Sequence, residues 1–164
     1  MKKSFVTLLL LVFGSASLAR AMNGLVYENG GGVGYINQSD SVQFKVLGSY
    51  FKDVHNNYQD ITALKISLAK DIREIDEVKV YTGASYWTNL MGSSTTSYYQ
   101  RTSLIFGVRQ TFHKNFQIEI FVEPISYADG QTYNAKTDTL SVNTANSGWN
   151  FFRNGAIALE YFFD

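Results

Sequence analysis

The chain has 164 residues, enough for one domain, and its 14 acidic residues balance its 14 basic ones. A formal net charge of zero offers no electrostatic basis for binding nucleic acid, and the lack of cysteine excludes disulfides and a lipid-anchor cysteine. Charged residues, at 17%, lie below the roughly 25% of a typical soluble protein while aromatic residues reach 15%, which favours contact with an apolar surface.

Residues 1–21 are predicted to be a secretory signal peptide. Lys2 and Lys3 precede the apolar run 5–13, and small residues then lead to the Ala-Arg-Ala segment 19–21, which fits a cleavage site. A cut after Ala19 fits equally well. The apolar run is too short to span a bilayer, and no later stretch is long and apolar enough for a transmembrane helix. Cleavage after residue 21 leaves 143 residues, of which 11 are basic and 14 acidic.

The segment 22–37 is interrupted by glycines at 30–32 and 34, which obscure any alternation of side chains. We interpret it as two short strands around a turn at residues 29–31. One long strand weakened by glycine is the competing interpretation. The glycines do not lead from a strand into a helix, so they do not form a phosphate-binding loop.

Six later segments alternate large apolar residues with small or polar ones. Successive side chains of a strand point to opposite faces, so this two-residue period predicts strands with one apolar face. The segments are 41–51, 61–72, 78–87, 98–112, 116–123 and the C-terminal residues 154–164. Together with the two strands in 22–37, they predict an all-β, eight-stranded antiparallel up-and-down transmembrane β-barrel.

The predicted connections alternate in length along the chain. Short turns are expected at 37–40, 73–77 and 113–115, and longer loops at 55–60, 90–97 and 128–148. A hairpin inside 128–148 would restore an even strand count if 22–37 were a single strand. Transmembrane barrels of the bacterial outer membrane have this asymmetry, with short turns facing the periplasm and longer loops facing outside.

Nine charged residues are expected on the polar face of the predicted strands. An eight-stranded barrel has an interior just wide enough for its side chains, so five cations and four anions would fill the lumen as hydrogen-bonded ion pairs. We therefore expect no general diffusion pore; a gated conduit or proton path is the functional alternative. The residues are Lys45, Lys65, Asp71, Lys79, Arg101, Arg109, Glu119, Glu123 and Glu160.

Alternation alone does not distinguish a membrane barrel from a soluble exported barrel that binds a small apolar ligand, in which the apolar set would form the core. Three features favour the membrane, and the third is the C-terminal segment described in the next paragraph. The polar face is rich in Ser, Gly, Ala and Gln rather than in Lys and Glu. Aromatic residues gather near both ends of the strands, as in the aromatic girdles of outer-membrane barrels.

The C-terminal alternation of Ile157, Leu159, Tyr161 and Phe163 resembles the C-terminal signature of Gram-negative outer-membrane barrels, although Asp164 follows the last aromatic residue. Length and loop asymmetry are similar to those of the small barrels of the outer-membrane protein A and X type. This resemblance covers most of 22–164 and implies an outer-membrane location. It also implies contact with lipid and lipopolysaccharide and recognition by the barrel assembly machinery. We expect a monomer whose loops contact an extracellular protein or glycan.

A lipid A-modifying enzyme is the remaining alternative. His55 lies beside Asp53 in a loop that could approach Ser93 or Ser94, which would build a Ser-His-Asp arrangement. His113 is interpreted as a solvated turn residue. Two separated histidines without cysteine give no recognisable metal-ligand spacing. We therefore expect a non-enzymatic protein with no metal or cofactor and no nucleic-acid partner.

Overall fold

In the computed structural model of the chain, every described element is a β-strand. The structure describes residues 21–29, 31–51, 61–90, 97–134, 139–142 and 147–163, and none of them forms a helix long and apolar enough to cross a membrane. The predicted signal peptide lies outside the described residues except for Ala21. The strands are β1 (Ala21–Glu28), β2 (Gly32–Ser39), β3 (Val42–Phe51), β4 (Ile61–Ile75), β5 (Val78–Leu90), β6 (Ser97–His113), β7 (Phe116–Asn134), β8 (Thr139–Val142) and β9 (Gly148–Phe162).

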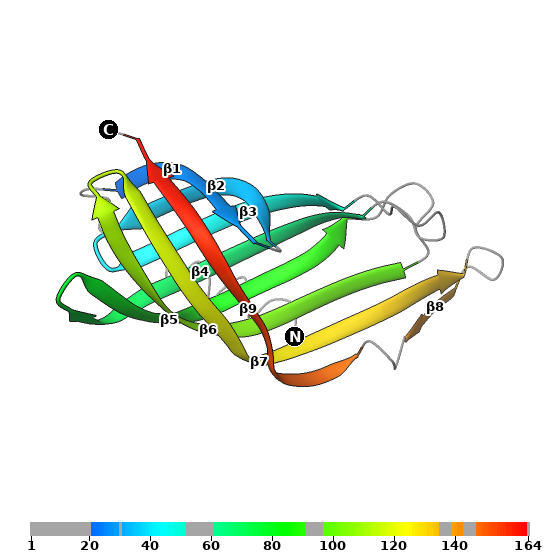
Figure 1. Cartoon of the computed structure of the whole chain (residues 1–164). Helices are drawn as coiled ribbons and strands as arrows, with labels where there is room; N and C mark the ends of the chain where they lie inside the picture. The colour runs from blue at the N-terminus through cyan, green and yellow to red at the C-terminus, as the bar shows by residue number, and fades with distance from the viewer. Residues whose placement is uncertain are drawn as a thin grey trace.

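Eight of these strands form a closed antiparallel barrel (Figure 1). Each strand from β1 to β7 pairs with the next one along the chain. β9 pairs with β7 on one side and with β1 on the other, from Gly24↔Phe162 to Glu28↔Ala158, and this second pairing closes the barrel. Closure leaves no continuous free sheet edge. The predicted eight-stranded antiparallel barrel is confirmed.

The two-strand interpretation of 22–37 is also confirmed. β1 and β2 pair along their whole length, from Ala21↔Ser39 to Glu28↔Gly32, around a turn at Asn29 and its neighbours. Glycine is required here because Gly32 has a φ of +101°, in the left-handed region, and an added Cβ would lie 2.1 Å from the Gly48 carbonyl oxygen.

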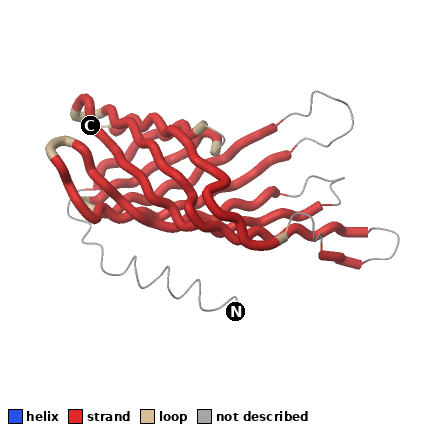
Figure 2. Tube along the Cα trace, turned by 60° about the horizontal axis from the view of Figure 1, so that its bottom comes forward, coloured by secondary structure: helices blue, strands red, loops and turns tan. Residues whose placement is uncertain are grey.

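Short turns join β2 to β3, β4 to β5 and β6 to β7, as predicted. Asp40 and Asp76 occupy two of them with positive φ, which Asp tolerates better than most residues. The three turns gather at one end of the barrel, near the C-terminus, as tan segments in Figure 2. We call it the turn end and the opposite end the loop end. The predicted loop 55–60 lies outside the described residues, as does 91–96 of the predicted loop 90–97.

The predicted loop 128–148 is partly strand. β7 continues to Asn134 and pairs there with β8, from Gln131↔Val142 to Asn134↔Thr139. This hairpin extends beyond the barrel wall at the loop end (Figure 1). Because β8 has only four residues, its alternation is too short to be recognised from the sequence.

The large apolar side chains of the barrel strands face outward. Phe106, Ile120 and Leu159 are exposed, whereas Lys65 and Arg109 are buried. The polarity of a soluble barrel is therefore reversed, with apolar groups outside and charged groups inside. Inward apolar residues form two smaller clusters. One contains Val26, Ile36, Leu47, Ala158 and Phe162, and the other contains Ala69, Tyr81, Ile105 and Phe121.

The strands of the barrel extend to different distances at the loop end. β2 pairs with β3 only as far as Gly48, and β1 pairs with β9 only from Ala158 onward, whereas β6 and β7 stay paired up to Ser97↔Thr132. The β1–β2 hairpin therefore forms a low side at the loop end, opposite the tall β4–β7 wall (Figure 1). β7 bulges at Pro124, between Glu123 and Ile125, where the missing N–H of proline disturbs no regular pairing.

Candidate functional site in the lumen

All nine charged residues predicted for the lumen take part in ion pairs. Six side chains are almost fully buried, while Asp71, Lys79 and Arg101 keep 12%, 29% and 21% of their side-chain surface exposed. Glu28 joins them, which makes five cations and five anions among the described residues in these pairs. We call this set the lumen network; it consists of Glu28, Lys45, Lys65, Asp71, Lys79, Arg101, Arg109, Glu119, Glu123 and Glu160.

Lys45 forms the central part of the network with two carboxylates. Its Nζ lies 2.5 Å from Glu119 Oε1 and 2.6 Å from Glu160 Oε1. Gln117 and Gln43 donate to Glu160 Oε2 at 2.5 and 3.1 Å. Buried carboxylates are tolerated only with such partners, so these contacts join β3, β7 and β9 across the lumen.

A second group lies nearer the loop end, around Glu123. Lys65 bonds to Glu28 and lies 3.8 Å from Glu123 Oε1. Arg101 Nη2 approaches Glu123 Oε2 at 3.3 Å, and Ser103 and Asn154 each donate to that oxygen at 3.1 Å. The two cations and the two carboxylates of this group therefore neutralise one another.

A third group lies toward the turn end. Arg109 bonds to Asp71, and Lys79 Nζ lies 3.9 Å from the other Asp71 oxygen. The Arg109 guanidinium also covers the Tyr81 ring at 4.9 Å from its centroid, a cation–π contact. Gly107 makes room for Tyr81, since an added Cβ would lie 2.5 Å from the Tyr81 hydroxyl oxygen.

Glu28 is the member of the network that the sequence did not indicate. Glu28 lies on the inward face of β1 together with Gly24 and Val26. Gly24 has no side chain to mark that face, and the strand ends at the glycine run directly after Glu28. The alternation therefore had too few informative positions to assign a face. Its carboxylate balances the network, and an added Cβ at Gly31 would lie 2.4 Å from one of its oxygens.

The lumen is closely packed near its centre and opens into a cavity toward the loop end. Between the central and loop-end groups, a void lined by Lys45, Lys65, Ser67, Glu119 and other side chains has no room for a water molecule. Above it, a cavity of about 220 Å³ opens toward the loop end. We call it the vestibule; it is lined by Glu28, Asn29, Lys65, Trp87, Tyr99, Arg101, Phe121, Glu123, Asn154, Gly155 and Ala156.

The proposed C-terminal assembly residues lie on the outer face of β9 and just beyond it. Ile157, Leu159, Tyr161 and Phe163 are all exposed, and the Tyr161 and Phe163 rings meet edge to face with centroids 6.0 Å apart. The intervening Glu160 and Phe162 are buried in the lumen. This strand thus presents four apolar side chains outward.

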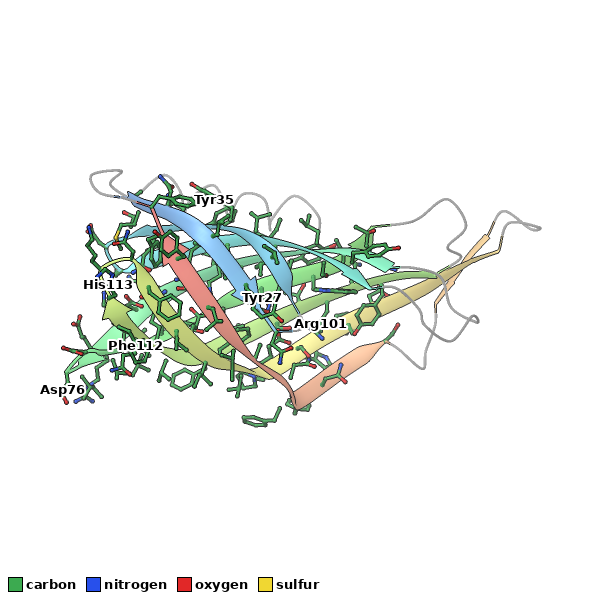
Figure 3. The ribbon with its side chains drawn as sticks, turned by 45° about the horizontal axis from the view of Figure 1, so that its top comes forward. Tyr27, Tyr35, Asp76, Arg101, Phe112 and His113 are labelled. Carbon is green, nitrogen blue, oxygen red and sulfur yellow. The ribbon has the colours of Figure 1, made fainter. Side chains whose placement is uncertain are left out.

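The structure does not test the alternative catalytic arrangement. Asp53, His55, Ser93 and Ser94 lie outside the described residues. His113 is exposed at the end of β6, beside the turn, and Figure 3 places it with Asp76 and Phe112 at the turn end. The described part of the chain contains no cluster of His, Cys, Asp or Glu residues suited to a metal ion.

Comparison with known proteins gives no relative. No family model, curated protein or solved structure matches this chain.

Proposed function

We propose that the chain is a small outer-membrane β-barrel protein whose lumen is plugged by side chains and whose loop end serves a structural or surface-interaction role. The observation that carries this proposal is the reversed polarity of the wall. Large apolar side chains face outward on the barrel strands, and ten ionisable side chains pair inside. Contiguous apolar surface of this extent is rare on monomeric soluble proteins.

The strand lengths support the same proposal. A membrane-crossing strand needs about 9–11 tilted residues. β3 has 10 residues, and β4, β5, β6, β7 and β9 have between 13 and 19. β1 and β2, with 8 residues each, fall just short of that length on the low side.

Exposed aromatic residues near the strand ends support an interfacial girdle. Tyr127 and Trp149 contact edge to face, with centroids 5.3 Å apart, on the loop-end half of β7 and β9. Phe112 and Phe163 are exposed near the turn end. Outer-membrane barrels carry girdles of aromatic residues at both membrane interfaces.

The plugged lumen argues for a role other than diffusion. The void between the central and loop-end groups has no room for water, and its lining charges are paired. The void between these groups likewise has no room for an apolar ligand. Surface interaction at the loop end is therefore favoured over transport and over apolar-ligand storage.

Cell fractionation combined with gel mobility tests the proposal. The folded chain should sediment with outer membranes, need detergent for extraction, and migrate differently on gels before and after heating. Recovery as a soluble periplasmic monomer would overturn the membrane assignment. Lipid A mass spectra with and without the protein test the enzyme alternative, and altered acylation that is lost in His55→Ala would overturn the non-enzymatic assignment.

A further inference from the structure

The vestibule is a built cavity rather than a gap between loops. Its walls come from strand residues of β4, β5, β6, β7 and β9 and from the end of β1, and its floor is the buried Lys65–Glu28 pair with Phe121. Because β1 and β2 are short, it meets solvent on the low side, where Asn29 and Gly155 are exposed. Figure 3 shows Arg101 in the barrel well away from the turn-end residues.

Aromatic rings form the apolar part of this lining. Trp87 and Tyr99 meet edge to face with centroids 5.5 Å apart on the tall β5–β6 wall. Deeper in, Lys65 Nζ lies 4.6 Å from the centroid of the buried Phe121 ring. Lys65 therefore covers one face of Phe121, and the Trp87 and Tyr99 rings are the ones suited to a flat or weakly polar ligand face.

The polar part of the lining is neutral and already paired. Lys65 and Arg101 are matched by Glu28 and Glu123, so a charged ligand would have to separate ion pairs in a confined space. Hydrogen-bonding capacity nevertheless remains. The Arg101 side chain keeps 21% of its surface exposed, and Asn29 and Asn154 bring amide groups to the rim.

The volume limits the ligand to a single ring. Pockets for drug-sized ligands typically hold about 300–1,000 Å³. The vestibule, at about 220 Å³, is smaller, and the water-free void below it prevents deeper entry.

We propose that the vestibule binds a neutral, ring-sized polyhydroxyl group, such as the terminal hexose of a glycan, which stacks against the aromatic wall and hydrogen-bonds to Arg101 and Asn154. A ring with hydroxyls at its edge and C–H groups on its faces matches both halves of the lining. The low side leaves room for the rest of a glycan to extend outward. This inference does not require the outer face to contact lipid.

Titration of the folded, full-length protein with monosaccharides tests this proposal. The probes are the methyl glycosides of glucose, galactose and mannose, and the comparators are glucuronic acid, glucosamine and phenol. Trp149 is replaced by phenylalanine, so that Trp87 is the single tryptophan and its fluorescence reports on the vestibule. At least one neutral glycoside should produce a saturable change with a dissociation constant on the order of 1 mM, and the comparators should bind more weakly.

Two leucine substitutions form a matched pair for this test. Ala156→Leu fills the vestibule, whereas Ala84→Leu adds the same atoms to the outer face of β5. Calorimetric titration should show binding at least about tenfold weaker in Ala156→Leu and unchanged in Ala84→Leu, because only the first removes ligand volume. Binding of no neutral glycoside, tighter binding of a comparator, or equal effects of the two substitutions would each overturn the proposal. Fractionation of the same proteins tests membrane location separately.

Discussion

Removal of the Lys45 ammonium tests whether the central ion pairs hold the barrel wall together. Its side chain is 4% exposed, and its Nζ contacts both Glu119 and Glu160 within 2.6 Å. In Lys45→Met, two buried carboxylates lose their shared cation. At an effective dielectric constant of 20, each pair contributes about 4 kcal/mol at a charge separation of about 4 Å. The free-energy cost of burying the Lys45 ammonium offsets part of the attraction of the two pairs.

The net loss expected from breaking a buried pair is about 3–5 kcal/mol of unfolding free energy. Urea titration of the protein folded in lipid vesicles, followed by tryptophan fluorescence, measures it. Lys70→Met is the matched control, because Lys70 is exposed on the outer face of β4 near the turn end, and it should change stability by at most about 1 kcal/mol.

Neutralising the carboxylates should reverse the loss. When Glu119→Gln and Glu160→Gln are added to Lys45→Met, no unpaired charge remains, so most of the lost stability should return. The reasoning is refuted if Lys45→Met costs no more than Lys70→Met, or if the triple variant is less stable than Lys45→Met.

Three further predictions concern the lumen and the strand ends. Planar bilayer recordings should show no large, stable channels, because the void below the vestibule excludes water; long-lived open levels would contradict the plug. Gly107→Ala should lower the free energy of unfolding by about 1–3 kcal/mol, because the added Cβ would lie 2.6 Å from the Ile120 carbonyl oxygen. Gly48→Ala is the control, because its Cβ would meet nothing within 4 Å. Equal urea midpoints for the two variants would show that Gly107 is not tightly packed. Phe163→Ser should lower the yield of folded barrel in cells but leave refolding into detergent unchanged, if the exposed ring is read by the assembly machinery; an equal defect in both would assign it a purely structural role.

The side-chain faces of the six alternating segments could be predicted because the barrel has one polar interior and one apolar exterior. A two-residue period then assigns every position, as it did for Lys45 and Phe106. The tight turns followed from the same pattern, since alternation stops where the chain reverses.

Other features depend on information that no local pattern carries. Alternation placed Tyr81 on the inward face, but it could not show that Gly107 on the neighbouring strand leaves the space for so large a ring. The vestibule depends on the unequal heights of strands that are far apart in the sequence. Which cation meets which carboxylate depends on the stagger of the strands around the closed barrel.

The contact between the outer face and hydrocarbon is tested most directly by one tryptophan at position 106. Phe106→Trp is made with Trp87 and Trp149 replaced by phenylalanine, and the protein is folded into vesicles whose acyl chains carry bromine. Because Phe106 is exposed on the outer face of β6, we expect strong quenching by the brominated chains and little by aqueous iodide. Strong quenching by iodide with none by the brominated lipid would contradict the account.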